Sequence, residues 1–225
     1  PPIPDPLWSR GLGDVYKRQK HMSCGEGGIL LTNDENYATL ARKHGGHGYK
    51  NLTADGGVIK FGNKRTVQDP SYKRHDVLGW NYRMPEFNAA IALAQLENLE
   101  SAVERRKNVA NLFLEAMLPY PFIVPQHVPS TYVHSFFTLG CKWEHPAVTW
   151  YEFRDKYIDL GGDGFYAAWS IPYREPLMKD KRYRGECPIA EKTQPKLLQM
   201  KTNYRCLETA KKQASLLHKT LDFFK

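Results

Sequence analysis

The sequence predicts a mixed α/β protein built from part of a larger α/β layer and a small α+β module. Three observations lead to this fold class. A short apolar run leads into a capped amphipathic helix within residues 29–45. An alanine-rich helical pattern then covers residues 85–117. Four prolines between residues 119 and 129 separate this helix from alternating strand and helix patterns that run to residue 225.

Residues 1–19 differ from the rest of the chain. The segment PPIPDPLWSRGLGDVYKRQ is rich in proline and has no amphipathic period. Its last six residues, DVYKRQ, are the translation of a transposase end sequence used in preparing DNA sequencing libraries. We therefore interpret residues 1–19 as a non-native, adapter-derived segment, the alternative being a native proline-rich arm. Native sequence is then expected to start at Lys20.

The first native elements are a strand and a helix. Ile-Leu-Leu-Thr at 29–32 lies between glycines and Asn33-Asp34, which predicts a short buried strand. Asn33 or Asp34 can cap the following helix, and Gly45 ends it. The stretch G-G-H-G from Gly45 onward follows a helix, so it fits a helix end and turn better than a phosphate-binding loop. Residues 45–77 predict a long loop with a hairpin around Asn63.

The helix that begins at Pro85 is unusually long. Proline suits the first helical turn, where its missing N–H is not needed. An unbroken helix to residue 117 would be about 50 Å long, so we expect it to bridge two domains or to kink near Ser101. The prolines beyond it mark a linker, so residues 20–118 and 119–225 are expected to form two domains, the second a small α+β domain.

Beyond the linker, strand and helix patterns alternate with turn signals. They predict a strand at 132–143, a helix at 149–160 capped by Thr149, a turn at 161–164, a strand at 165–169, and helices at 189–200 and 203–224.

The composition excludes several classes of protein. With 225 residues, 41% hydrophobic and 25% charged, the chain reads as an ordinary globular protein. The net charge of +8 raises nucleic-acid binding, but basic and acidic residues are interspersed, which favours a solvated surface. No apolar run approaches the roughly 20 residues that span a bilayer, and no secretory leader pattern is present, so we expect a cytoplasmic protein. The four cysteines form no C-x-x-C pair and no H-E-x-x-H occurs, so we expect free thiols and no metal site.

Three motifs occur together along the chain. Lys20 begins K-H-M-S-C-G-E-G-G, N-Y-R-M follows at 81–84, and A-I-A-L-A-Q-L lies in the long helix at 90–96. Together they resemble the DegT/StrS family of nucleotide-sugar aminotransferases, in which K-x-x-x-x-G-E-G-G is followed by N-Y-R-M and A-x-x-x-A-Q-L. A looser likeness extends over residues 20–225. The Ser-Phe that precedes the lysine in that family is absent, as is the upstream half of a typical member.

The resemblance implies a fold-type-I pyridoxal-phosphate (PLP) transferase, similar to aspartate aminotransferase. Residues 20–118 would be the remnant of its PLP-binding large domain together with the long interdomain helix. Lys20 would form an aldimine with PLP, be displaced by an amino-acid donor, and then move the proton between carbon atoms. Taken alone, without its motif, the same lysine would read as a solvated surface charge.

Four further residues are candidates for binding. Asn81 matches the family asparagine that reaches the cofactor phosphate of the neighbouring subunit; its alternative is a turn or cap residue. Arg83 could hold a carboxylate or a phosphate, or form a structural salt bridge. Tyr166 and Trp169 fall where the family has a segment facing the sugar, although the sequence departs from the family pattern there and an aromatic packing role fits equally well.

The resemblance thus implies transamination of a keto-sugar nucleotide, with glutamate as the usual donor, by a homodimer that makes polysaccharide or lipopolysaccharide sugars. A sugar dehydratase of the same family, which keeps PLP but has histidine in place of the lysine, is the nearest alternative, and Lys20 argues against it. A regulatory or nucleic-acid-binding protein is the alternative from another class. The chain itself is expected to be inactive, because the family's phosphate-binding loop and the acid that pairs with the pyridine nitrogen lie upstream of Lys20.

Overall fold

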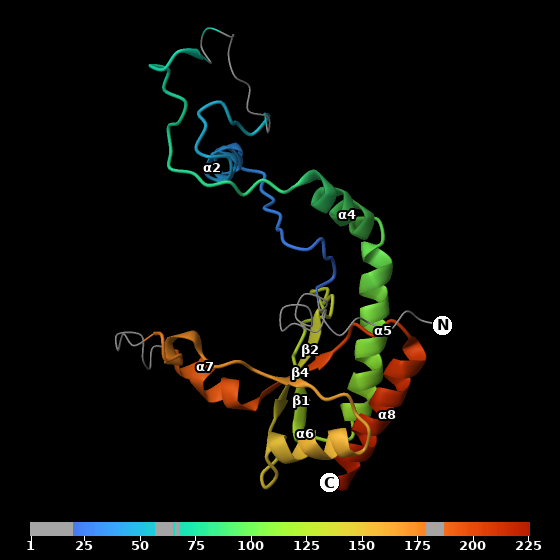
Figure 1. Ribbon diagram of the computed structural model, residues 1–225. Coiled ribbons are helices and arrows are strands. Elements are labelled where there is room, and N and C mark those ends of the chain that lie inside the picture. Colours follow the sequence, from blue (N-terminus) through green and yellow to red (C-terminus); the bar gives the residue numbers. More distant parts are fainter. Residues whose placement is uncertain (1–19, 57–64, 66–67, 179–186) are drawn as a thin grey trace. The chain divides into compact units, whose positions relative to one another are not determined.

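The computed structural model describes residues 20–56, 65, 68–178 and 187–225. The segment 1–19, which we interpret as adapter-derived, and the hairpin expected around Asn63 lie outside these residues. The chain divides into two compact units (Figure 1). Residues 23–95 form one, which we call the N-terminal unit; residues 20–22 and the described residues from 96 to 225 form the other, the C-terminal unit. The division falls at Leu96, within the long helical region, rather than at the proline linker.

A four-stranded antiparallel sheet organises the C-terminal unit. The strands are β1 (Ile123–Pro125), β2 (Thr138–Trp143), β3 (Tyr166–Ala167) and β4 (Leu197–Lys201), in the order β1-β2-β4-β3. Strand β1 arises inside the proline linker, where no strand was expected, because Pro125 takes the last position and the linker returns antiparallel to β2.

The helix expected at 189–200 is wrong. The structure has a short helix α7 (Pro188–Thr193), a 3-10 turn η4 (Gln194–Lys196) and then β4, which lies between β2 and β3. Pro195 ends the helical stretch. Leu198 and Met200 are buried while their neighbours are half-buried, which is the alternation of a strand.

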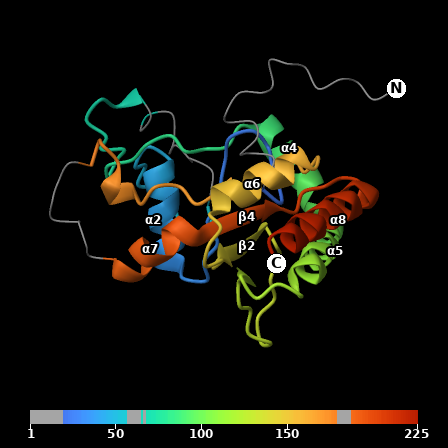
Figure 2. The ribbon, with the colours of Figure 1, turned by 90° about the horizontal axis from the view of Figure 1, so that it is seen from below.

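Three helices close the core of this unit. They are α5 (Leu99–Met117), α6 (Trp150–Asp159) and α8 (Leu207–Phe223), and a single 3-10 turn η2 (Pro172–Arg174) precedes α7. Helices α5 and α8 lie side by side (Figures 1 and 2). Apolar side chains from all three helices and from the sheet form one buried cluster, which includes Val109, Phe113, Leu139, Trp143, Phe153, Tyr157, Leu198, Leu217 and Leu221.

The long helix breaks, as expected, close to Ser101. Helix α4 (Glu86–Leu96) ends and α5 begins at Leu99, so the interruption lies three residues before the expected position. Helix α6 carries the expected cap: Thr149 and Glu152 form a complete capping box. Among the described helices, none combines the length and the apolar character that crossing a bilayer requires.

The N-terminal unit contains α2 (Glu35–Gly45), whose N-cap Asp34 accepts hydrogen bonds from the amides of Asn36 and Tyr37, as the sequence predicts. The buried strand expected at 29–32 does not form. Ile29 and Leu31 are 73% and 88% exposed, and no described residue pairs with this segment. A strand needs a neighbour for its backbone hydrogen bonds, so an apolar run without one stays irregular.

Candidate functional site

Lys20 lies in the C-terminal unit with its main chain held and its side chain exposed. Its carbonyl accepts a hydrogen bond from Arg106 Nη2 at 3.0 Å, and its Nζ lies 4.6 Å from the centroid of the Phe137 ring. The next residue continues the contact, because His21 Nε2 lies 3.0 Å from the carbonyl oxygen of Ser135. Lys20 is therefore an exposed residue whose backbone is hydrogen-bonded through Arg106 to the segment before β2.

Asn81 lies where two backbone segments of the N-terminal unit pair in an antiparallel bridge, opposite Gly46. The segment after α2 pairs with the segment before α4, through His47 N to Trp80 O at 2.8 Å and Tyr82 N to Gly45 O at 2.8 Å. The pairing needs two glycines: Gly48 has φ +76°, and a Cβ added at Gly79 would collide with the backbone of Gly48. Gly48, which was predicted only as part of a helix end and turn, thus also helps to place Asn81.

Arg83 and Asn81 form a side-chain pair. Arg83 Nε donates to Asn81 Oδ1 at 3.0 Å, and both residues are exposed. The Asn81 amide oxygen accepts from Arg83, and the NH₂ group is the donor of this side chain. No carboxylate among the described residues forms a salt bridge with Arg83. The pair presents amide and guanidinium donors, which is the chemistry that phosphate oxygens accept.

A hollow of about 840 Å³ lies beside this pair within the N-terminal unit. Residues 28–35, parts of α2, Leu52, Tyr82 and Arg83 line it. Much of its wall is the exposed apolar run that was expected to be a buried strand. The hollow therefore marks apolar surface that the described residues leave uncovered.

Tyr166 and Trp169 lie in the C-terminal unit, as Lys20 does, and both are exposed. Tyr166 opens β3, and the carbonyl of Trp169 accepts a hydrogen bond from Gln194 Nε2 at 3.0 Å. The exposed fraction is 41% for Tyr166 and 72% for Trp169. It does not support the alternative in which these aromatics fill the core.

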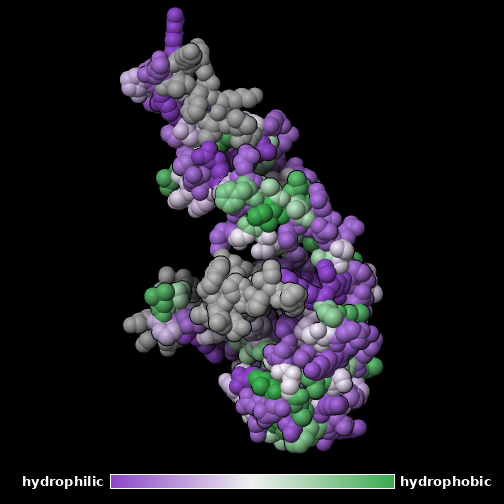
Figure 3. All heavy atoms as spheres, turned by 45° about the vertical axis from the view of Figure 1, so that its right-hand side comes forward, coloured by the Kyte–Doolittle hydropathy of each residue, from purple (hydrophilic) through white to green (hydrophobic). Residues whose placement is uncertain are grey.

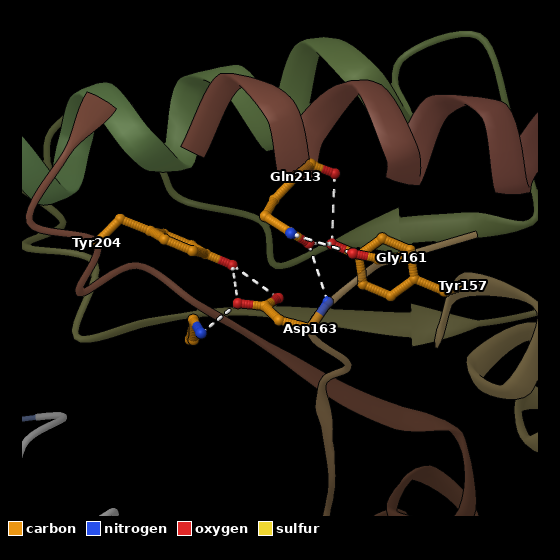
Figure 4. A network of polar contacts seen from close by, with 6 residues as sticks. Tyr157, Gly161, Asp163, Tyr204 and Gln213 are labelled. Atoms are coloured by element: carbon orange, nitrogen blue, oxygen red, sulfur yellow. Dashed lines mark hydrogen bonds and ion pairs between the residues drawn. The ribbon is translucent and has the colours of Figure 1, made fainter. Parts of the chain in front are cut away.

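A polar network fixes the turn that leads into β3 (Figure 4). Tyr204 donates to both carboxylate oxygens of Asp163 at 2.8 Å, and Lys201 forms an ion pair with Asp163. Gln213 Oε1 accepts from Tyr157 Oη at 2.8 Å and from the Asp163 amide at 3.0 Å. Burial and the Asp163 carboxylate raise the pKa of Tyr157 and of Tyr204 above the usual phenol range, so both stay protonated donors.

Sequence reasoning did not find this network or Arg106. The turn 161–164 was recognised from its glycines, but nothing in the sequence shows that Asp163 is tied to residues 41 and 50 positions further along the chain. Cys141, by contrast, needs no role in a reaction. It is buried in β2, and burial raises the pKa of its thiol to about 12, which keeps it unreactive.

The arrangement belongs to a known class of fold, that of fold-type-I PLP-dependent sugar-modifying enzymes. Helicobacter pylori PseC, an aminotransferase involved in the biosynthesis of pseudoaminic acid, is similar with a TM-score of 0.65 and 16% identity over 85% of this chain and 48% of that one. An aminotransferase from Psychrobacter cryohalolentis matches with a TM-score of 0.70 and 18% identity, over 91% and 53% of the two chains. An E. coli GDP-4-keto-6-deoxy-D-mannose-3-dehydratase with bound hydrated PLP has a TM-score of 0.61 and 18% identity, over 88% and 52%.

A family model of the DegT/DnrJ/EryC1/StrS aminotransferases matches residues 16–212, and the chain belongs to this family. The resemblance inferred from the motifs around Lys20 and the predicted fold class are thereby confirmed. The chain spans about half the length of the solved structures that it matches.

Proposed function

We propose that the complete protein transfers an amino group from an amino acid, with glutamate as the donor, to a keto-sugar nucleotide, using PLP held by Lys20. The observation that carries this proposal is the K-x-x-x-x-G-E-G-G segment that begins at Lys20, in a chain that belongs to the family. Lys20 is exposed, and its carbonyl accepts a hydrogen bond from Arg106. Family membership supports the reaction class and the cofactor.

The described residues fit this cofactor. PLP, when bound, supplies the electron sink for removing a proton from the carbon that bears the amino group. Lys20 Nζ is the group that binds it covalently and later takes and returns that proton. Asn81 would donate from its NH₂ group to the cofactor phosphate of the neighbouring subunit, and Arg83, which contacts the Asn81 amide oxygen, could hold a carboxylate or a phosphate.

We place the reaction in the biosynthesis of polysaccharide or lipopolysaccharide sugars, in a cytoplasmic homodimer. Tyr166 and Trp169 are the residues we assign to the sugar substrate, because both rings are exposed beside a fixed turn. The likeness to PseC supports a sugar pathway, since that protein is involved in pseudoaminic acid biosynthesis.

Two other functions are weighed against this one. The likeness to a sugar dehydratase shows that the same fold serves dehydration, but Lys20 stands where such dehydratases of the family have histidine. The net charge of +8 is the observation that supports nucleic-acid binding. Transamination remains the function that the residues support best.

The decisive experiment expresses the complete reading frame that contains this chain. We expect visible absorbance from lysine-bound cofactor, lost in Lys20→Ala and kept in Lys219→Ala, a matched change on the exposed face of α8. Amino transfer from glutamate to a keto-sugar nucleotide should accompany it. Water loss from the sugar without amino transfer would favour the dehydratase. A colourless protein that binds DNA in a salt-sensitive manner would refute the enzyme.

The 225-residue chain alone is expected to retain cofactor weakly and to aggregate. Apolar side chains lie open on its surface (Figure 3), and neither α2 nor α4 buries any residue. Exposed apolar patches of this kind drive association. Size-exclusion chromatography tests the expectation, and a monodisperse sample that unfolds cooperatively would contradict it.

A further inference from the structure

Arg106, in α5, is a buried cation whose hydrogen-bond partners among the described residues are neutral. Its residue is 6% exposed. Its guanidinium donates to Phe137 O at 3.0 Å, to Thr202 Oγ1 at 3.2 Å and to Lys20 O at 3.0 Å. Among the described residues no carboxylate pairs with it. Burying a charge is costly unless its donors are satisfied, and here two backbone carbonyls and a hydroxyl accept from it.

The partners of Arg106 form a second layer of hydrogen bonds. Thr202, which follows β4 and is 1% exposed, donates from Oγ1 to Phe136 O at 2.6 Å. Phe136 has φ +47°, a left-handed backbone conformation that is rare for a bulky residue and persists only where neighbouring contacts hold it. The bend at Phe136 thus brings two successive carbonyls, of Phe136 and Phe137, to the buried pair of Thr202 and Arg106.

Lys20 is seated on this bend. Its ammonium lies over the Phe137 ring, and His21 contacts Ser135 O. Its carbonyl is the third acceptor of Arg106. A single guanidinium therefore joins the backbone of the lysine to the residues before β2 and after β4, which are the ends of the two central strands.

We infer that Arg106 is a positioning residue for the reactive lysine: it fixes the main chain at Lys20 and so aims the amine, without touching substrate. The catalytic meaning of this inference rests on the proposed function of Lys20, whereas the anchoring does not. Fixing a reacting group in advance spares the entropy of ordering it in each turnover. This role accounts for the presence of a cation at a buried position in α5.

The anchoring is tested by native-state proteolysis of the 225-residue chain with endoproteinase Lys-C. Endoproteinase Lys-C must bind the Lys20 carbonyl oxygen in order to cleave, and this is the atom that accepts the hydrogen bond from Arg106. We expect Arg106→Met to speed cleavage of the Lys20–His21 bond about tenfold or more, because a charge-assisted hydrogen bond is lost. Arg105→Met, an exposed neighbour on the same helix, should cleave like the wild type.

Cleavage after Lys142, in the middle of the sheet, reports general opening of the unit. If Arg106→Met accelerates both cleavages equally, or leaves the Lys20 site unchanged, the inference is overturned. Should Arg106→Met fail to fold, Thr202→Val removes the hydroxyl and keeps the side-chain shape. It should speed cleavage after Lys20 roughly threefold, and an unchanged rate would count against the anchor.

The catalytic consequence is tested in the holoenzyme from the complete reading frame. Arg106→Met should lower kcat about tenfold or more at little change in donor KM, and should move the pH profile of the visible absorbance. Arg106→Lys should restore part of kcat and part of the pH profile, and Arg105→Met should match the wild type in both measurements. A wild type without cofactor on Lys20 would refute the proposed function but leave the proteolysis result standing. Normal kcat and spectrum in Arg106→Met would refute the positioning role.

Discussion

Replacing Gln213 by leucine isolates the polar network beside β3. The side chain is buried in α8, and its Oε1 accepts from Tyr157 Oη at 2.8 Å and from the Asp163 amide at 3.0 Å. Each buried donor left without an acceptor costs about 1–3 kcal/mol. Tyr157 Oη also lies 3.3 Å from the Gln213 carbonyl, to which it can turn, so its share is at the low end. We expect Gln213→Leu to lower the free energy of unfolding by about 3 kcal/mol.

A double-mutant cycle makes this expectation sharp. Tyr157→Phe should lower the free energy of unfolding by only about 1 kcal/mol, because Gln213 Oε1 still accepts the hydrogen bond from the Asp163 amide. In the double variant only that amide is orphaned, so its cost should fall below the sum of the two single costs by about 1 kcal/mol. Lys212→Leu, an exposed neighbour in α8, is the control and should change stability by less than about 0.5 kcal/mol.

Urea unfolding of the dilute chain, read by pulse proteolysis, measures these differences without requiring high concentration. Strictly additive costs would show that Tyr157 and Gln213 do not act through the shared hydrogen bond. A cost below about 1 kcal/mol for Gln213→Leu would show that solvent reaches the network, and the reasoning from buried donors would then be refuted.

Three further outcomes are expected. Gly79→Ala places a Cβ against the opposing backbone, so it should speed hydrogen exchange of the Trp80 amide about 30-fold, corresponding to roughly 2 kcal/mol. Gly28→Ala is the control, because a Cβ there meets open space and should leave this exchange rate unchanged. Equal effects of the two variants would contradict the close approach at Gly79. Thr149→Ala should lower the stability of the C-terminal unit by about 1 kcal/mol in urea unfolding, and no loss would show that the capping box is unused. Burial raises the pKa of Tyr204, so its contribution is complete below about pH 10 and is lost as pH rises further; Tyr204→Phe should therefore flatten the alkaline fall in stability, and an unchanged alkaline limb would refute this.

Elements with local signals could be predicted from the sequence. Thr149 was identified as a cap, and the cap of α2 was narrowed to Asn33 or Asp34, because a capping side chain bonds to amides two or three residues away and its signal lies within one turn. The break near Ser101 could be expected from length alone. Helix α8 was also found, although it begins at Leu207, four residues later than predicted. In each case the information needed lies within a few positions of the residue.

Elements that depend on distant partners were missed. Strand β4 was taken for a helix because two leucines and a methionine near residues 197–200 also fit a helical face. What decides the structure is pairing with β2, some 60 residues earlier in the chain. The reverse error occurred at 29–32, where a strand-like sequence finds no partner among the described residues and stays exposed. The hydrophobic period and the residue propensities of a segment can indicate a strand, but the strand forms only when a neighbouring strand pairs with it.

The same distinction holds for the candidate site. The motif around Lys20 and the N-Y-R-M segment are each made of consecutive residues. The family resemblance that they indicated is confirmed by the family comparison. Arg106 stands in an unremarkable run of charges and was read as part of a solvated surface. Its function as an anchor depends on Lys20, Phe137 and Thr202, which lie 86, 31 and 96 positions away. No local pattern could have singled it out.

The two units differ in how a substitution should be interpreted. In the C-terminal unit Arg106 and Gln213 are buried, so any change there alters stability as well as position, and only paired controls separate the two effects. Asn81 and Arg83 are exposed and contact each other. Replacing either removes no core contact, so a loss of cofactor affinity in Asn81→Ala at unchanged stability can be assigned directly to binding. The N-terminal pair is therefore where the proposed cofactor site can be tested with the least ambiguity.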